Sequence, residues 1–323
     1  MTRLATAAIG LALLASGCAT PKVTAVNAPA VDLRAQPHTT AEPGIHDPLQ
    51  ETQLLYGERV RILKTEDGWA QVEALEQPEF THARRWQGYP GWVPAAALSP
   101  AGSPWSPTIV VTQPWAATWQ DAYQRRSSPH RFALGTRLRA IDMGGQVWQV
   151  ELLDGSTVWM RHEDARALEE LAALPALERR RLIVHHAEQL LGQPYYWGGR
   201  SPADPTTPNK RAAHGLDCSG LVNLVYRAAG ADIPRDAHEQ YVRARRVNAP
   251  QPADLIFLSE RDNPDRIVHV MLYAGDGEVI EGPGTGLPVR RIAVAQRLGH
   301  PVDWLAPGTV VDGQTVYVGS YLP

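Results

Sequence analysis

The feature that most constrains the fold of this chain is a series of short apolar runs in its first half, each followed by a glycine, a proline or an Asp-Gly pair. Short runs of β-forming residues with closely spaced turn signals are typical of small antiparallel barrels. The first set of runs covers residues 31–34, 53–58, 60–63, 69–72 and 91–94. We therefore expect strands rather than helices in this part of the chain.

A second set of runs repeats the pattern at residues 109–111, 137–141, 147–152 and 157–160. Each set ends in a strand that carries a tryptophan, Trp92 in the first and Trp159 in the second. The recurrence predicts two related SH3-like β-barrels, over residues 31–100 and 105–168.

The pattern changes after a helix-prone link at residues 170–178. Ile183, Ala187 and Leu190 fall at helical spacing. A second apolar helix is expected to begin at Cys218 and to end at Gly230, because glycine commonly terminates helices. Strand-like runs follow at 254–258, 268–273 and 279–281. Helices followed by a sheet predict an α+β domain, which we assign to residues 179–307.

Length and charge narrow the class of protein. At 323 residues the chain is long enough for two or three domains. Its 31 basic and 34 acidic residues give a formal net charge of −3, without the basic excess of nucleic-acid-binding proteins. We therefore expect no nucleic-acid partner.

The N-terminus has the features of an export signal. Arg3 precedes an apolar stretch at residues 4–15, and small residues lead to Cys18. Residues 1–18 therefore resemble a bacterial lipoprotein signal peptide, with Cys18 as the lipidated residue and 19–30 as a tether. We expect an exported protein of the cell envelope, anchored to a membrane by lipid. An ordinary signal peptide with a chance cysteine is the alternative.

If Cys18 carries lipid, Cys218 is the only thiol left, since the chain has two cysteines. Cysteines outside the cytoplasm are usually paired, so an unpaired one favours a chemical role. A small buried core residue is the alternative. Because Cys218 opens the predicted helix, free backbone N–H groups and the helix dipole would favour its thiolate.

A base and an orienting group follow on the predicted strands. His269 lies in an apolar run, and Glu281 comes after the turn at residues 275–277. With a three-residue loop Met271 would pair with Glu281, which places Glu281 on the same face as His269. With a two-residue loop the two side chains would point to opposite faces. The set Cys218, His269 and Glu281 fits a nucleophile, its base and the residue that orients the base.

The remaining histidines do not indicate a metal site. His185, His186 and His214 do not have the spacing of a zinc site, so we expect neither a metal nor a cofactor. Residues 201–214 form a long loop just before Cys218, either beside the cleft or as a neutral surface insertion.

Four ordered blocks make a family resemblance specific. They cover residues 194–199, 216–222, 254–257 and 269–277, and they resemble the signature blocks of NlpC/P60 papain-like cysteine peptidases. The resemblance spans about 179–307 and implies hydrolysis of peptidoglycan peptides. The third polar position of this family is often histidine, so Glu281 departs from the commonest form.

The first half also resembles one subgroup, the YkfC-like γ-D-glutamyl-L-diamino acid endopeptidases with N-terminal SH3 domains. This resemblance implies that the first barrel leans over the cleft and helps to bind a free N-terminal L-Ala. The contacts it implies are Glu58, Tyr89, Asp217 and Ser219. Plainer readings are a turn-closing carboxylate for Glu58, barrel packing for Tyr89 and a helix cap for Asp217. Ala237 stands at a further recognition position and has no hydroxyl.

We therefore predict a peptidase that cleaves the γ-D-glutamyl-diamino acid bond of muropeptides with a free L-Ala amine. Three rivals remain. One is a general murein endopeptidase whose barrels bind wall polymer, and another is a catalytically silent wall-binding lipoprotein. The third uses the same fold for acyl transfer or for hydrolysis of a different amide.

Overall fold

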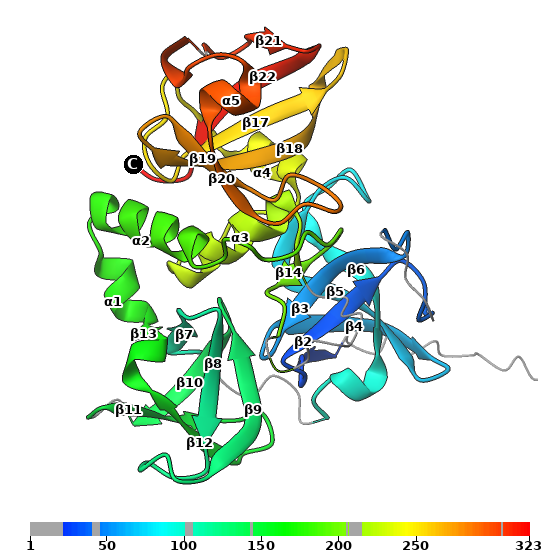
Figure 1. Cartoon of the computed structure of the whole chain (residues 1–323). Helices are drawn as coiled ribbons and strands as arrows, with labels where there is room; N and C mark the ends of the chain where they lie inside the picture. The colour runs from blue at the N-terminus through cyan, green and yellow to red at the C-terminus, as the bar shows by residue number, and fades with distance from the viewer. Residues whose placement is uncertain are drawn as a thin grey trace, which may run out of the picture.

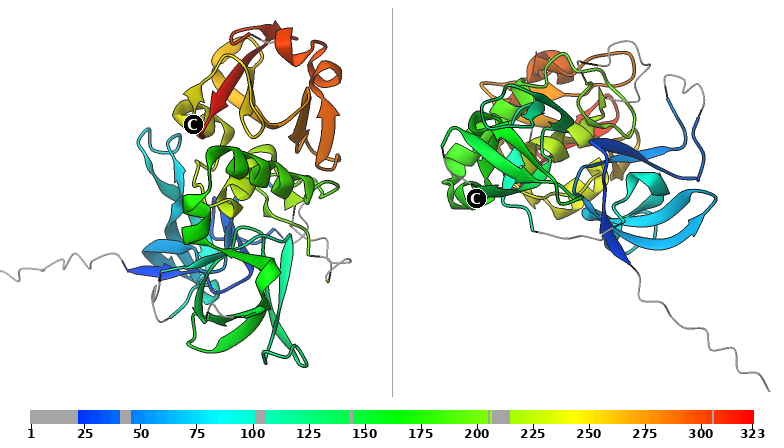
Figure 2. Two further views of the ribbon diagram at one scale, coloured as in Figure 1. Left: turned by 90° about the vertical axis from the view of Figure 1, so that its left-hand side faces the viewer. Right: turned by 90° about the horizontal axis from the view of Figure 1, so that it is seen from below.

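Three large sheets organise the chain, which is seen here as a computed structural model (Figure 1). The structure describes residues 22–40, 46–100, 106–142, 145–204, 206, 215–304 and 306–323. Helices α2 (Ala176–Glu188) and α3 (Cys218–Ala228) lie between the third sheet and the two N-terminal β-units (Figures 1 and 2). Cys18, His214 and most of the loop at 201–214 fall outside the described residues.

The first β-unit is a six-stranded sheet in the order β1-β4-β5-β6-β2-β3. Its strands are β1 (Val23–Ala25), β2 (Ala30–Arg34), β3 (Gln50–Leu55), β4 (Arg59–Glu66), β5 (Trp69–Glu79) and β6 (Gln87–Pro94), followed by the short helix η1 (Ala95–Ala97). Alternate residues of β5 are buried, as expected for a sheet with one face on a core. Strand β1 lies within the predicted tether at 19–30, which is therefore wrong in part, because Val23–Ala25 pairs with β4.

The second β-unit is a seven-stranded sheet in the order β13-β7-β10-β11-β12-β8-β9. Its elements are β7 (Ile109–Val111), β8 (Trp115–Trp119), β9 (Ser127–Ala133), β10 (Arg137–Asp142), β11 (Val147–Glu151), β12 (Thr157–Arg161), η2 (His162–Asp164) and β13 (Ala165–Ala167). The prediction of a mainly β first half is confirmed. That this unit is a second SH3-like barrel stays a prediction.

Helix α1 (Leu168–Ala173) continues directly from β13, and α2 follows it after Leu174 and Pro175. Proline fixes an extended residue before it and fits the first turn of the next helix, so the predicted link becomes two helices with a break.

Helix α3 is buried along its whole length. The side chain of Asp217 caps its N-terminus by accepting a hydrogen bond from the backbone N–H of Gly220. Gly230, with φ of 78°, follows the C-terminus in the left-handed conformation that glycine tolerates best. The predicted helix start at Cys218 agrees with the structure.

The third sheet has the order β16-β22-β17-β18-β19-β20, with β21 paired to β22. Its strands are β16 (Arg245–Arg246), β17 (Leu255–Glu260), β18 (Asn263–Gly275), β19 (Glu278–Glu281), β20 (Arg290–Ala293), β21 (Val310–Val311) and β22 (Gln314–Ser320). The remaining elements are β14 (Arg200–Ser201), β15 (Gly215–Leu216), α4 (Ala237–Arg243), α5 (Val294–Leu298) and η3 (Val302–Trp304). Since β22 pairs with β17 inside this sheet, the predicted domain end at 307 is too early.

One apolar cluster joins the two β-units to a third unit, which runs from α2 through β22. Leu55 of the first unit and Leu134 of the second belong to the same buried cluster as Leu221, Leu224 and Phe257. The N-terminal units therefore share a core with the third unit instead of hanging from it on a linker. Among the described residues, no helix has the length and apolarity needed to cross a membrane.

Candidate active site

Cys218 is the first residue of α3, and it is almost fully buried. The first turn of α3 is tightly packed: a Cβ atom added to Gly220 would lie 2.1 Å from the carbonyl oxygen of Gly199. Glycine at position 220 thus allows the start of α3 to pack against the backbone at Gly199, just before β14. This fixes the thiol at the positive end of the helix dipole.

The hairpin that carries His269 and Glu281 combines features of both expected loops. The pairs Leu272–Ile280 and Tyr273–Val279 are those of the three-residue alternative. The loop itself has two residues, Asp276 and Gly277, both with positive φ, as two-residue hairpins prefer.

A bulge between Tyr273 and Gly275 reconciles the two. The extra residue shifts the register by one, so the side chains of His269 and Glu281 lie on the same face despite the short loop. Sequence alone left this choice open.

The three side chains meet as the sequence predicts. His269 Nε2 lies 2.7 Å from Glu281 Oε2, and the imidazole is also hydrogen-bonded to the thiol of Cys218. Burial lowers the pKa of His269, but the charges and hydrogen bonds of Cys218 and Glu281 outweigh it and raise the pKa to about 9. The arrangement favours an imidazolium beside the Cys218 sulfur.

Two arginines hold Glu281, and the sequence analysis missed both. Arg290 donates Nε and a terminal N–H to Oε1, at 3.0 and 2.7 Å. Arg297 Nε lies 3.1 Å from Oε1 and 3.2 Å from Oε2. Burial raises the pKa of Glu281, but His269 and the two guanidinium groups together lower it to about 2. Their only sequence signal was the presence of basic residues shortly after the hairpin.

A cleft of about 370 Å³ opens at Cys218 between the first and third units. Gln50, Glu51, Thr81, His82 and Tyr89 line it from the first unit. From the third unit it is lined by Tyr195, Trp197, Gly198, Asp217, Cys218, Ser219, Asp236, Ala237, His238, Glu239, Arg266, Ile267, Val268, His269 and Pro283. The first β-unit therefore forms one wall of the site.

Acidic side chains from both units meet in the cleft. The Tyr89 hydroxyl is 3.0 Å from Asp236 Oδ2 and 3.3 Å from Glu51 Oε2. A phenol has one proton, so it can donate to only one of these carboxylates. Burial, the largest influence, raises the pKa of Asp236 to about 7, since Glu239 and Asp217 together with burial outweigh the attraction of Arg235.

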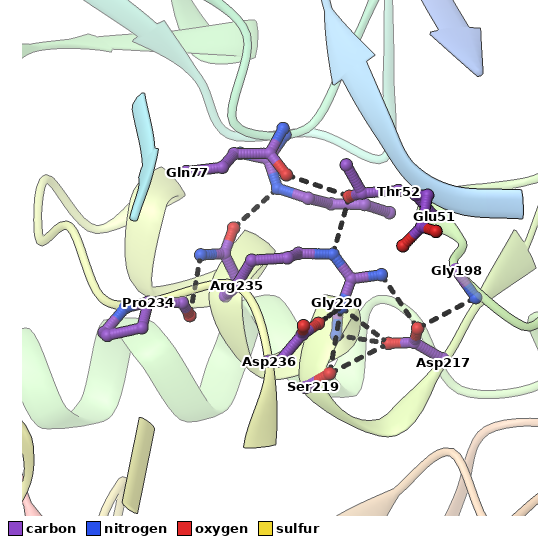
Figure 3. Close-up of polar contacts among 12 residues, drawn as sticks. Glu51, Thr52, Gln77, Gly198, Asp217, Ser219, Gly220, Pro234, Arg235 and Asp236 are labelled. Carbon is purple, nitrogen blue, oxygen red and sulfur yellow. Dashed lines mark hydrogen bonds and ion pairs between the residues drawn. The ribbon is translucent and has the colours of Figure 1, made fainter. Parts of the chain in front are cut away.

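Arg235 is completely buried, and its guanidinium contacts residues that line the cleft (Figure 3). It donates to both carboxylate oxygens of Asp217, at 3.1 and 2.8 Å, and to the Ser219 hydroxyl at 2.9 Å. It also donates to Thr52 of the first unit at 2.7 Å. Asp217 and Ser219 line the cleft as predicted, but these contacts already satisfy much of their hydrogen-bonding capacity.

Glu58 does not reach the cleft, so its predicted substrate contact is not supported by its position. Its carboxylate is 1% exposed and pairs with Arg200 at 2.7 Å, while Gln77 donates to its second oxygen at 2.9 Å. Glu51, seven residues earlier on β3, occupies the wall instead. The turn after β3 carries Glu58 to the buried seam between the units.

Two further observations complete the site. Tyr195 lines the cleft, and burial, with the charges of Asp217 and Cys218, raises its pKa, so the hydroxyl remains a donor near the thiol. His186, one of the histidines considered for a metal, is buried and bonds Gln189. In the described ranges, no group of three or more acidic, histidine or cysteine side chains is arranged to hold a metal.

Comparison with known proteins agrees with this geometry. The NlpC/P60 family model matches residues 192–298, and the model of the bacterial dipeptidyl-peptidase SH3 domain matches residues 43–77. The peptidoglycan endopeptidase RipB of Mycobacterium tuberculosis is 31% identical over 210 residues, which are 62% of this chain and 80% of RipB. The chain belongs to the NlpC/P60 family. The predictions of a cysteine peptidase and of an SH3 domain before it are thereby confirmed.

Two further relatives match more of this NlpC/P60 chain. The γ-D-glutamyl-L-lysine dipeptidyl-peptidase of Bacillus cereus is 29% identical over 239 residues, which are 72% of this chain and 67% of that protein. The crystal structure of an NlpC/P60 family protein from Bacillus cereus aligns with a TM-score of 0.71 at 23% identity, covering 94% of this chain and all of the other. The fold is therefore shared over nearly the whole described length.

Proposed function

We propose that this protein hydrolyses the γ-D-glutamyl-diamino acid bond of muropeptides that carry a free N-terminal L-Ala, using Cys218, His269 and Glu281. The observation that carries the proposal is the pair of carboxylates, Glu51 and Asp236, that share the single proton of Tyr89 in the cleft of the thiol.

An ammonium group is the ligand that these two carboxylates fit. Tyr89 can donate to only one carboxylate at a time. Beyond it, Glu51 lies 3.5 Å from His82 Nε2, and Asp236 lies 3.6 Å from Arg235. These contacts leave carboxylate oxygens for a substrate amine, which brings both donors and positive charge. Arg235 donates its short hydrogen bonds to Asp217 and Ser219 and lies 3.6 Å from Asp236, so its one charge is divided among these acceptors and does not neutralise the two carboxylates fully. The name of the Bacillus cereus relative, a γ-D-glutamyl-L-lysine dipeptidyl-peptidase, supports a substrate with two residues before the cleaved bond.

The chemistry follows from the geometry of the three side chains. The Cys218 thiolate attacks the γ-carbonyl carbon of D-Glu, and His269 gives its proton to the departing amine of the diamino acid. His269 then takes a proton from water, which attacks the thioester. The products are L-Ala-D-Glu with a free γ-carboxylate, the diamino acid peptide and the restored thiol. Glu281 accepts from His269 Nε2 throughout, which leaves Nδ1 for the proton transfers.

The test uses L-Ala-γ-D-Glu-meso-diaminopimelate and its N-acetylated twin, with Cys218→Ala as the blank and products followed by mass spectrometry. We expect release of L-Ala-D-Glu from the free-amine peptide only. Glu51→Gln should raise KM for that peptide at least about tenfold, since one charge-assisted contact is lost. Glu66→Gln, a surface carboxylate of the same unit that pairs with Lys64, is the matched control and should behave as wild type.

Other outcomes identify the rivals. Equal cleavage of both peptides would favour a general murein endopeptidase. A new ester or amide on the γ-carboxyl would favour acyl transfer, and no reaction with either peptide would refute the proposed specificity.

We further propose that Cys18 anchors the exported protein to a membrane of the envelope. Support comes from the N-terminal sequence and from relatives named as peptidoglycan endopeptidases. Metabolic labelling with a palmitate analogue should mark the wild type and not Cys18→Ser, and equal labelling would contradict the assignment.

A further inference from the structure

The contacts of Glu281 extend the catalytic centre beyond the three residues named so far. Its carboxylate is fully buried and accepts from three cationic or potentially cationic side chains: His269, Arg290 and Arg297. A lone buried carboxylate would be costly, so some compensation is required. Two guanidinium groups give more positive charge than neutrality of the carboxylate needs.

The two arginines contact different parts of the carboxylate. Arg290 bonds only Oε1, through two nitrogens, which holds that oxygen in place and leaves Oε2 for His269. Arg297 reaches both oxygens, so it shares with His269 the oxygen that orients the imidazole. Arg290 is thus placed to orient the carboxylate of Glu281. Arg297 is placed to weaken the negative electrostatic field of Glu281 at His269.

We propose that Arg290 and Arg297 are positioning residues of the reaction: they keep Glu281 ionised and oriented, and they limit how strongly it holds the proton on His269. Without the two arginines, the negative charges of the Cys218 thiolate and of Glu281 would hold the proton more tightly on His269. An imidazolium that releases its proton less readily is a weaker general acid for the departing amine. The proposal rests on the proposed function only for the identity of the reaction.

The charged surroundings support this assignment. Cys218 faces His269 from α3, Arg290 comes from β20 and Arg297 from α5, while Asp217, Asp236, His238 and Arg266 line the same cleft. Only Arg290 and Arg297 among these contact the carboxylate of Glu281 within the part of the chain that the structure describes. Their side chains are 37% and 25% exposed, so water screens their effect in part.

The experiment compares Arg297→Gln and Arg290→Gln with Arg291→Gln in the full chain. Arg291 is the matched control, because it lies on the same strand but pairs with Glu278 and Glu188 at the surface. Two readouts are needed: the pH profile of kcat/KM, and an NMR titration of the His269 imidazole, which requires no substrate.

Arg297→Gln should move both the alkaline limb of the profile and the His269 titration upward by about 0.5–1 pH unit, because a positive charge near the imidazole is lost. Arg290→Gln should lower kcat at least about tenfold with KM little changed, and Arg291→Gln should match wild type. In a Glu281→Gln background, Arg297→Gln should shift the titration less than in wild type, because the part of the effect that acts through the carboxylate is already gone.

An unchanged titration in Arg297→Gln, with reduced thermal stability alone, would show a merely structural role and overturn the inference. If the wild type fails to cleave the tripeptide but the titration shifts as expected, the proposed substrate is wrong and the positioning role stands.

Discussion

The position of Glu58 gives a prediction that separates structure from substrate recognition. Glu58 and Arg200 are 1% and 0% exposed and lie 2.7 Å apart across the seam between the first and third units. Glu58→Gln keeps the shape of the side chain but removes its charge. Arg200 then stays buried without a counter-charge, while the new amide group faces N–H donors of Arg200 and Gln77.

Breaking such a pair from one side costs about 3–5 kcal/mol of unfolding free energy. Urea unfolding followed by tryptophan fluorescence should show this loss in Glu58→Gln. Removing the partner as well, in Glu58→Gln with Arg200→Met, should cost less than the sum of the single changes by about 1–3 kcal/mol. For the protein that remains folded, KM for the free-amine tripeptide should equal that of wild type.

The opposite pattern would refute this reasoning. If Glu58→Gln unfolds within about 0.5 kcal/mol of wild type while KM for the free-amine tripeptide rises, Glu58 contacts the substrate and the buried pair contributes little. Glu51→Gln provides the comparison, because it should alter KM while the buried pair of Glu58 and Arg200 stays intact.

Three other predictions follow from the site. The pKa of Asp236 is about 7, so its negative charge is present above that pH. KM for the free-amine peptide should therefore fall as the pH rises from about 6 to 7.5, and Asp236→Asn should abolish this change. A wild-type KM that does not vary with pH would contradict the prediction. In Gly220→Ala the new Cβ would lie 2.1 Å from a carbonyl oxygen, so circular dichroism melts should show a loss above about 2 kcal/mol, or no folded protein. Folding lowers the pKa of Glu281 from 4.5 to about 2. The resulting stabilisation, on the order of 3 kcal/mol, is present above pH 4.5 and is lost as the pH falls toward 2. The difference in unfolding free energy between wild type and Glu281→Gln should therefore shrink over that range.

The parts of the site that are formed by residues close together in the sequence could be predicted from local sequence patterns. The start of α3 at Cys218 follows from an N-cap aspartate, an apolar run and a closing glycine, all within 14 residues of chain. The shared face of His269 and Glu281 required a choice between two loops, and the bulge that decides it leaves no clear trace in sequence.

The parts that sequence could not supply come from tertiary contacts. Glu51 and Asp236 lie 185 positions apart and meet only because the first unit docks beside α4. Arg290 and Arg297 lie on a four-residue strand and a five-residue helix, which are too short for periodicity to reveal. The position of Glu58 was mistaken because its strand is clear from sequence, whereas the side on which its turn emerges is not.

The buried arginines explain why the first unit belongs to the catalytic machinery. Arg200 and Arg235 come from the third unit and are fully buried, yet they bond Gln53, Glu58 and Thr52 of the first unit. Without the first unit, Arg200 would lose its counter-charge Glu58, and Arg235 would lose Thr52 as a hydrogen-bond acceptor. Arg235 in turn holds Asp217, the cap of the helix that presents Cys218. The seam that buries these charges therefore both restricts the cleft and fixes the nucleophile, which a detachable wall-binding module could not do.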